Sequence, residues 1–487
     1  MNEDTPAMVH QLAEAAAAAF ATARHSSGAD RAAWLRAIAD RLDAHVDELV
    51  AIADAETFLG DARLRGEVAR TTGQLRLFAD VILEGSYLEA TIDHAVPTAT
   101  PPRPDLRRML LPLGPVAVFS ASNFPFAFSV AGGDTASALA AGNPVIVKAH
   151  SGHVRLSQRT AELVTAALHE AGAPDGMFAL TVGREAGVAL VDHPLIQAVG
   201  FTGSVSGGRA LYNQAAARPV PIPFYGELGS INPVVVTAAA DAAQGVELAA
   251  GLAASFQLGV GQFCTKPGLV FVPEGSRLEA SVAQHVGTDS RPMLTERIAV
   301  GFDAGIAELL AVPGAVLIAG EAPTTPAEGT VGAAARVISL PVGALDTHAD
   351  TVLAEVFGPV TVLLRYRDEA SLVNALGRLD GSLTATLHAA PGEPVAAILD
   401  LLTARAGRVL FAGWPTGVAV TWSQHHGGPY PATTSVFTSV GATAIRRFLR
   451  PITFQDAPEA LLPAALQDHN PLQIPRRIDG ALVLPAV

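Results

Sequence analysis

Short apolar strands alternate with helices between residues 116 and 201, and this alternation restricts the fold more than any other feature of the chain. Strands are expected over residues 116–120, 145–147, 178–182 and 197–201, with helices over 135–141 and 155–171. Strands that alternate with helices of this length form a parallel sheet with helices on both faces. The chain is therefore predicted to be an α/β protein.

A second alternating stretch begins near Pro233 and continues to about residue 421, so two α/β lobes are expected. Residues 27–57 have a helical pattern, and Ser27 and Asp30 resemble a capping box at its start. Prolines between residues 86 and 115 exclude a long helix and indicate an extended arm or hairpin. This arm and the segment from Pro429 onward are expected to reach another subunit.

Charge and cysteine content exclude several classes of function. The 487 residues include 32 Lys and Arg against 46 Asp and Glu, a formal charge of −14, which disfavours nucleic acid and anionic membranes as partners. The single cysteine, Cys264, excludes an intrachain disulfide and any multi-cysteine metal site, so no metal is expected. The acidic start and the lack of an 18-residue apolar run predict a cytoplasmic protein.

Cys264 lies in a glycine-rich bend between a predicted helix and a strand. Gly259, Gly261 and Gly268 surround it, and Lys266 follows two residues later. A lone cysteine is most often a small buried apolar residue. A bend, however, lets a main-chain N–H point at whatever the sulfur attacks, and Lys266 is expected to favour the thiolate. Cys264 is therefore a candidate nucleophile.

Two polar residues stand near predicted strand ends. Glu227 lies among apolar and glycine residues just before a strand, where desolvation is expected to raise its pKa toward the range of a general base. A structural pairing with an arginine is the alternative. Asn123 follows the strand at 116–120, where it either caps a turn or donates its amide N–H to a developing oxyanion.

A nucleotide-binding signal follows the strand at 197–201. Thr202, Gly203 and Ser204 form a turn, and a helix containing Gly207 comes next. Free amides and the helix dipole at such a turn hold a pyrophosphate, although many strand-to-helix turns look alike.

Four ordered motifs together resemble the aldehyde dehydrogenase superfamily over nearly the whole chain. They are Phe201-Thr-Gly-Ser204, Glu227-Leu-Gly, Gly261-Gln-Phe-Cys264 and Glu355-Val-Phe-Gly-Pro359. The sequences around them are similar to those of the subgroup that oxidises 2-oxoglutarate semialdehyde, with NADP-using fatty aldehyde dehydrogenases as near relatives.

The resemblance implies two Rossmann-like lobes and an oligomerisation arm. Residues 1–85 and 107–228 would bind the dinucleotide, residues 229–428 would carry the nucleophile, and residues 86–106 and 429–487 would form the arm and C-terminal tail. A homodimer or homotetramer is expected.

The resemblance also implies the roles of the site residues. Cys264 would attack the aldehyde carbon, Asn123 and the Cys264 main-chain N–H would hold the alkoxide, and hydride would leave to the nicotinamide. Glu227 would then activate the water that hydrolyses the thioester. Glu355 and Phe357 would contact the nicotinamide ribose and ring.

The preferred cofactor is predicted from charge. NAD-preferring relatives carry a glutamate three residues after the lysine that corresponds to Lys148, and here that position is Ser151. The missing carboxylate removes repulsion toward a 2′-phosphate. Lys148, Ser151 and His150 would contact that phosphate, with Arg184 as a helper, which favours NADP while leaving NAD possible.

Two alternatives remain open from the sequence alone. One is an NADP-dependent dehydrogenase for long-chain or varied aldehydes. The other is a cysteine hydrolase or acyltransferase without nicotinamide, in which Cys264, His425 or His426 and Glu227 form a triad. Histidine pairs in loops are more often solvated. Arg155, Arg159 and Arg446 are candidates for binding a substrate carboxylate.

Overall fold

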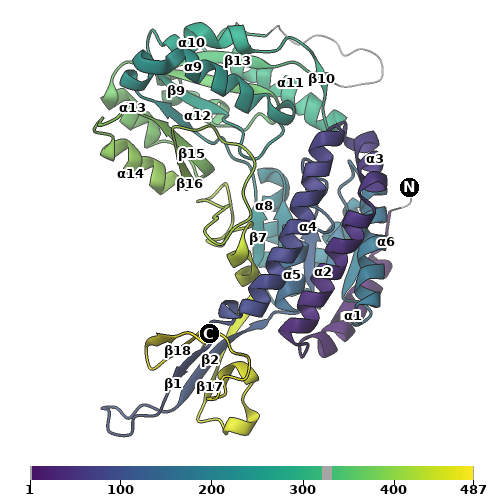
Figure 1. Cartoon of the computed structure of the whole chain (residues 1–487). Coiled ribbons are helices and arrows are strands. Elements are labelled where there is room, and N and C mark those ends of the chain that lie inside the picture. Colours follow the sequence, from purple (N-terminus) through teal and green to yellow (C-terminus); the bar gives the residue numbers. More distant parts are fainter. Residues whose placement is uncertain (1–2, 321–331, 486–487) are drawn as a thin grey trace.

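The computed structural model describes residues 3–320 and 332–485. Its elements form two α/β lobes and a small separate sheet (Figure 1). The α/β prediction is therefore confirmed. Among the described residues, no helix has the length and apolarity that a membrane crossing requires.

The first lobe is built on a five-stranded parallel sheet with the order β5-β4-β3-β6-β7. Its strands are β3 (Val116–Phe119), β4 (Val145–Lys148), β5 (Phe178–Thr181), β6 (Ala198–Thr202) and β7 (Phe224–Glu227). Its helices are α1 (Pro6–Ala23), α2 (Gly28–Ala44), α3 (Val46–Thr57), α4 (Asp61–Glu84), α5 (Gly133–Ala141), α6 (Val154–Glu170), α7 (Arg184–Asp192) and α8 (Val205–Ala217).

Alternate residues of each strand in this sheet enter different cores. In β3, Val116 and Val118 pack with α2, α4, α5 and α6, whereas Ala117 and Phe119 pack with α1, α7 and α8. Because both faces are covered by helices, the strands are apolar throughout, which is why they were recognisable in the sequence. The helical pattern over 27–57 is two helices that break at His45, and the capping box of Ser27 and Asp30 is present.

The second lobe contains a seven-stranded sheet with the order β11-β13-β14-β9-β8-β15-β16, in which only the edge pair β11–β13 is antiparallel. Its strands are β8 (Val234–Val236), β9 (Leu269–Pro273), β11 (Val316–Ala319), β13 (Arg336–Pro341), β14 (Val360–Tyr366), β15 (Ser382–His388) and β16 (Ala406–Phe411). Its helices are α9 (Ala238–Phe256), α10 (Arg277–Val282), α11 (Glu296–Leu310), α12 (Ala349–Val352), α13 (Glu369–Leu376) and α14 (Ala396–Arg405). A two-stranded ribbon of β10 (Arg291–Pro292) and β12 (Gly332–Ala333) lies beside it.

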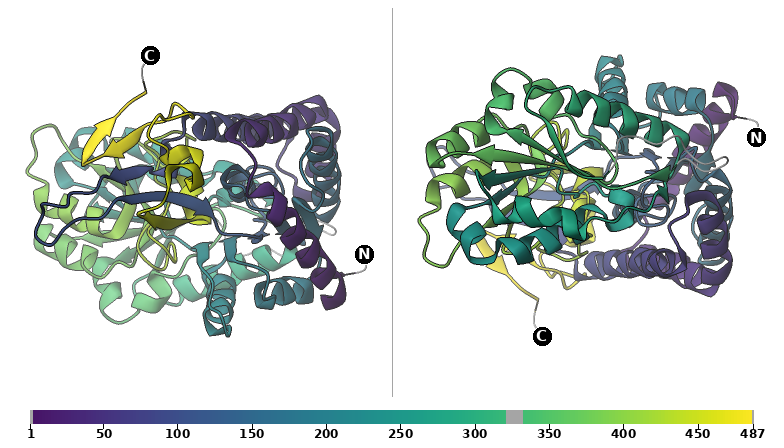
Figure 2. Two further views of the ribbon diagram at one scale, coloured as in Figure 1. Left: turned by 90° about the horizontal axis from the view of Figure 1, so that it is seen from below. Right: turned by 90° about the horizontal axis from the view of Figure 1, so that it is seen from above.

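The third sheet brings together segments from both halves of the chain, in the order β17-β2-β1-β18-β19. Its strands are β1 (Thr91–Asp93), β2 (Leu106–Pro112), β17 (Leu449–Gln455), β18 (Arg476–Ile478) and β19 (Ala481–Val483). Seen from below, β2 and β17 lie side by side although they are far apart in sequence (Figure 2). This sheet projects away from both lobes (Figure 1).

The strand order of the first sheet indicates where a ligand-binding site is expected. In the first sheet the order reverses between β3 and β6, and open α/β sheets bind ligands at the carboxyl ends of strands at such a point. Asn123 follows β3, and Thr202 ends β6. Glu227 ends β7, the next strand outward.

Candidate active site

Cys264 lies in the bend that joins α9 to β9, and the backbone of this bend is unusual. Gly259, Val260 and Gly261 all have positive φ angles, of 58°, 59° and 64°. A β-branched residue such as Val260 rarely adopts this conformation, so the surrounding structure must impose it. A side chain at Gly261 would collide with the carbonyl of Gly358. The bend is thus held against the loop that contains Glu355 and Phe357.

Asn232 fixes the other side of this bend. Its side-chain Nδ2 donates to the carbonyl oxygens of Cys264 at 2.8 Å and Lys266 at 2.9 Å. Asn232 is buried and was not identified from the sequence. No element of the described chain accepts a hydrogen bond from the Cys264 main-chain N–H, so this donor is free for a ligand.

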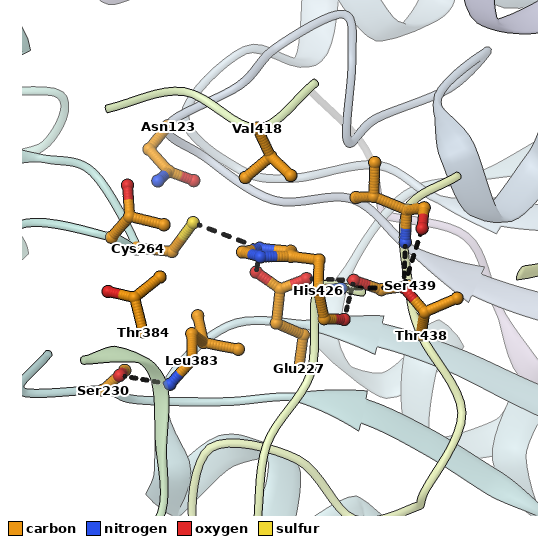
Figure 3. A network of polar contacts seen from close by, with 12 residues as sticks. Asn123, Glu227, Ser230, Cys264, Leu383, Thr384, Val418, His426, Thr438 and Ser439 are labelled. Atoms are coloured by element: carbon orange, nitrogen blue, oxygen red, sulfur yellow. Dashed lines mark hydrogen bonds and ion pairs between the residues drawn. The ribbon is translucent and has the colours of Figure 1, made fainter. Parts of the chain in front are cut away.

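One atom, the Nε2 of His426, contacts both Cys264 and Glu227 (Figure 3). His426 Nε2 lies 3.6 Å from Cys264 Sγ and 2.9 Å from Glu227 Oε1. His426 and Glu227 are almost completely buried, at 1% and 2% exposure. The thiol and the acidic side chain predicted to share one site therefore do so, and the solvated alternative for His426 is wrong.

The segment after β16 holds this acid–base pair in place. Residues 432–434 lie along β7, where Leu228 N donates to Ala432 O and Thr434 N donates to Gly226 O. Ser439 Oγ donates to Glu227 Oε2 at 2.7 Å, and the His426 main-chain N–H donates to Thr438 Oγ1 at 2.8 Å. Residues 429–448, expected in the C-terminal tail, thus form part of the site and of the core of the first lobe.

The pKa of Glu227 shifts in the direction opposite to the one expected from the sequence. Burial alone raises the pKa of Glu227, but the charge of His426 and hydrogen bonds from His426, Ser439 and Cys264 outweigh it, so the pKa is lowered. The predicted increase was wrong because the partners of Glu227 come from distant parts of the chain. Burial, together with the charge of Glu227, raises the pKa of the Cys264 thiol well above its usual range.

Lys266 does not assist the thiolate, and that expectation was also wrong. Its Nζ donates to the carbonyl oxygens of Val356 and Val360, both at 2.9 Å. Burial lowers the pKa of Lys266, and burial raises that of Glu355, with which Lys266 interacts. Lys266 therefore anchors the Glu355 loop and leaves His426 and Glu227 as the bases within reach of the thiol.

Asn123 lies near the sulfur of Cys264, on the side away from His426 (Figure 3). Its Nδ2 donates to Gln262 O at 3.0 Å, and Figure 3 shows its amide beside Cys264. An amide nitrogen carries two N–H donors, so one remains for a ligand. The free Cys264 N–H and this amide are suitably placed to stabilise an oxyanion.

A cavity of about 100 Å³ lies beside the thiol. Its lining residues are Arg70, Phe124, Phe128, Phe263, Cys264, Thr265, Gly417 and Val418. Of the proposed carboxylate-binding arginines, Arg159 pairs with Glu48 and Glu162, and Arg446 pairs with Glu89. Neither of these two, nor Arg155, is among the lining residues. Arg70 was missed by the sequence analysis.

The residues expected to hold a dinucleotide line the carboxyl edge of the first sheet. Lys148 ends β4 and is followed by His150 and Ser151, while Arg184 begins α7. Ser204 caps α8 by accepting from Gly207 N at 3.2 Å. The helix therefore begins at the predicted turn, and Thr202, Gly203, Ser204 and Gly207 lie together at its start.

Two features at this edge suit a ligand that carries phosphate groups. The amides at the start of α8 and the cation of Lys148 lie on one side, and the Glu355 loop faces them from the second lobe, where a side chain at Gly229 would come within 2.6 Å of Glu355 Oε2. His150 supplies no charge, because burial lowers its pKa to about 3. The negative charge of Glu3 acts on Lys148, whose pKa is lowered by burial.

A thiol beside two amide donors, with a strand-to-helix turn of the first lobe facing the Glu355 loop of the second, is an arrangement typical of thiol-dependent, dinucleotide-binding oxidoreductases. The sequence assigns the family directly: residues 1–430 match the model of the aldehyde dehydrogenase family, and the chain belongs to it.

Full-length relatives support this assignment. The chain is 50% identical over 484 residues to alpha-ketoglutaric semialdehyde dehydrogenase 2 of Azospirillum brasilense, covering 97% of this chain and 91% of that protein. It is 44% identical over 483 residues to alpha-ketoglutaric semialdehyde dehydrogenase of Acinetobacter baylyi, with the same coverage.

Solved structures agree on the fold. Proline utilization A of Bradyrhizobium japonicum matches with a TM-score of 0.78 at 27% identity over 93% of this chain, which spans 45% of that longer protein. An NADP-dependent enzyme of E. coli matches with a TM-score of 0.78 at 23% identity, over 92% of this chain and 90% of that one.

Proposed function

We propose that this aldehyde dehydrogenase oxidises 2-oxoglutarate semialdehyde to 2-oxoglutarate with NADP. The convergence of Cys264 and Glu227 on His426 Nε2, next to a cavity that Cys264 lines, is the observation that supports it most. The identity to two full-length semialdehyde dehydrogenases supports the choice of substrate.

The first step is deprotonation of the thiol. Burial and the charge of Glu227 hold the pKa of Cys264 high, so the thiol needs a base within reach. His426 Nε2, 3.6 Å from the sulfur, accepts the proton in the tautomer that carries its hydrogen on Nδ1, in which Nε2 donates nothing to Glu227 and Ser439 alone of the two residues holds the carboxylate. The Nε2–H that results then donates to Glu227, which stabilises the imidazolium.

The thiolate attacks the aldehyde carbon and forms a thiohemiacetal. Its alkoxide accepts hydrogen bonds from the second N–H of Asn123 Nδ2 and from the Cys264 main-chain N–H. Collapse of the alkoxide yields a thioester on Cys264 and releases a hydride.

A bound nicotinamide dinucleotide supplies the acceptor for that hydride. Lys148, Ser151, His150 and Arg184 would hold its adenosine end. Thr202, Gly203, Ser204 and Gly207 would hold the pyrophosphate at the start of α8, and Glu355 and Phe357 would contact the nicotinamide ribose and ring. Ser151 stands where a glutamate would repel a 2′-phosphate, and this supports the preference for NADP.

Hydrolysis of the thioester depends on Glu227. Burial favours uptake of a proton by Glu227, while the charge and hydrogen bond of His426 oppose it. Glu227 takes a proton from the water that attacks the thioester carbon, and Cys264 leaves as the thiolate when the carboxylic acid forms.

The test is an aldehyde panel with NADP and with NAD. It contains 2-oxoglutarate semialdehyde, succinic semialdehyde, pentanal and dodecanal. We expect the highest kcat/KM for 2-oxoglutarate semialdehyde with NADP. A clear preference for dodecanal would instead support the long-chain alternative, and no turnover of any aldehyde would contradict the proposal.

The closeness of the Cys264 thiol to the carboxylate of Glu227, which both contact His426 Nε2, also favours a second function, hydrolysis of activated esters or thioesters without nicotinamide. This reaction uses the same acyl-cysteine and the same water-activating pair. It is measured with p-nitrophenyl acetate in the absence of dinucleotide. Ester hydrolysis without any aldehyde oxidation would make the hydrolase assignment the better one.

We further propose that the third sheet joins copies of the chain into a homo-oligomer. Its edge strand β19 exposes Leu482 and Val483, and an exposed apolar edge strand is a site for pairing with another chain. Light scattering after size-exclusion chromatography tests this, and a monomer at micromolar concentration would refute it.

A further inference from the structure

Helix α4 directs three charged side chains toward the active site from a single face. Arg63, Glu67 and Arg70 are spaced four and three residues apart, so they lie one above another. Glu67 is buried, and its Oε1 accepts from the main-chain N–H groups of Phe126 and Ala127. The charges of Arg63 and Arg70 both act on this one carboxyl group, and neither guanidinium forms an ion pair with it in the described chain, so the cluster retains a net positive charge.

Arg70 is only partly satisfied. Its Nη2 donates to Val418 O at 3.2 Å, and its guanidinium lies 5.1 Å from the ring centre of Phe128. Its Nη1 is buried and has no hydrogen-bond partner within the described residues. A buried charged donor without an acceptor is costly to maintain, which points to a ligand that supplies one.

Arg70 and Cys264 line the same cavity beside the thiol. Three phenylalanines form its other large walls, so the remaining surface is mainly apolar. A ligand with an aldehyde at the sulfur and an anionic group at the guanidinium would match both ends of this space. The cavity of about 100 Å³ suits a short chain better than a long-chain aldehyde.

We propose that Arg70 is the specificity-determining residue that binds the carboxylate of the substrate, and that the site selects short aldehydes bearing a carboxylate at the far end. This inference rests on the proposed aldehyde oxidation and names the residue that recognises its substrate class. Arg70 pairs with the carboxylate through a charge-assisted hydrogen bond from Nη1.

Several other arginines have buried nitrogens without a partner among the described residues, and none of them lines this cavity. Arg63 Nη2 donates to Asn123 O at 2.6 Å, and its guanidinium lies between the rings of Phe124 and Phe263. It therefore positions the Asn123 loop. Arg408, on β16, has Nε and Nη2 without partners among the described residues and makes the best matched control.

The experiment compares two aldehydes of five carbons, 2-oxoglutarate semialdehyde and pentanal, in the Arg70→Met, Arg70→Lys and Arg408→Met variants. Met keeps the length and the packing on Phe128 but removes the charge. For Arg70→Met we expect the ratio of the two kcat/KM values to fall by about 10- to 100-fold, mainly through KM of the semialdehyde. Arg70→Lys should recover part of the ratio, and Arg408→Met should keep it.

A second measurement does not depend on turnover. Binding of 2-oxoglutarate to each protein is measured by calorimetry, and we expect it in the wild type and in Arg408→Met but not in Arg70→Met. Equal loss of both aldehydes in Arg70→Met with unchanged 2-oxoglutarate binding would overturn the inference, as would loss of the ratio in Arg408→Met alone. If the wild type oxidises no aldehyde, the proposed function fails while the binding comparison still decides the role of Arg70.

Discussion

His426 Nε2 lies 3.6 Å from Cys264 Sγ although 162 positions separate the two residues in the chain. The same nitrogen is 2.9 Å from the carboxylate of Glu227. A thiol with a raised pKa depends on such a neighbour, because the Lys266 ammonium is committed to the carbonyl oxygens of Val356 and Val360.

Replacing His426 by Gln should slow formation of the thioester. Gln fills much of the same space but cannot accept the thiol proton, and loss of a general base typically costs about 10²- to 10⁴-fold. Stopped-flow measurement of reduced cofactor should show a slower burst. An unchanged burst rate would mean that the thiol is activated by another group. Replacing His425 by Gln is the matched control, because no contact joins it to the thiol in the described chain.

Replacing Glu227 by Gln should preserve the burst and slow the steady state. Acylation still has His426 as its base, whereas hydrolysis loses the carboxylate that activates water. We expect about one reduced cofactor per site followed by a rate at least 10²-fold lower than that of the wild type. Mass spectrometry should detect the acyl group on Cys264. Loss of the burst itself would contradict the assignment of acylation to His426 and of hydrolysis to Glu227.

The lowered pKa of Glu227 also predicts how stability depends on pH. A carboxyl group with a lower pKa in the folded chain contributes stability above its ordinary pKa, about 4.5, and this contribution is lost as the pH falls through the folded value. The difference in melting temperature between the wild type and Glu227→Gln should therefore shrink as the pH falls from 6 to 3. A constant difference would show that Glu227 is not ionised in the folded protein.

Zinc should inhibit the enzyme. Cys264, His426 and Glu227 each offer one ligand atom, and these atoms lie within 4.8 Å of one another. Sulfur, imidazole nitrogen and carboxylate oxygen are the ligands that Zn²⁺ prefers, at about 2.0 to 2.3 Å. Micromolar Zn²⁺ should abolish activity, and a chelator should restore it. The His426→Gln variant, tested on its residual activity, should be less sensitive.

The negative charge of Glu3 should lower the preference of the enzyme for NADP over NAD. The exposed carboxylate acts on Lys148, and a side chain at Gly183, just before α7, would come within 2.7 Å of the Glu3 Cβ. Removing this charge in Glu3→Gln should raise the ratio of kcat/KM for NADP to that for NAD by about 3- to 10-fold. The effect should weaken at high salt. Replacing Glu14, an exposed acidic residue on helix α1, should leave the ratio unchanged.

The sequence was sufficient for the parts of the protein that are encoded locally. Apolar strands covered on both faces, the capping box at Ser27, and the glycine bend around Cys264 each have a signature within a few residues. The thiol, the carboxylate and the Asn123 amide could therefore be selected in advance.

The sequence could not show which distant residues of the chain contact the site residues. Glu227 contacts residues about 200 positions away, and its pKa shifts in the opposite direction from the prediction because of them. The paired histidines before two glycines were visible as a pattern, but no periodicity indicated that one of them is buried. Arg70 had only a weak signal, a charged side chain in phase with the buried face of α4.

The stretch of chain that supplies His426 and Ser439 runs on directly into β17 and ties the chemistry to the projecting sheet. A displacement of that sheet, or a truncation before it, would therefore disturb His426 and Ser439 before it disturbed Cys264. Contacts made by the projecting sheet would then affect turnover through a segment of fewer than thirty residues.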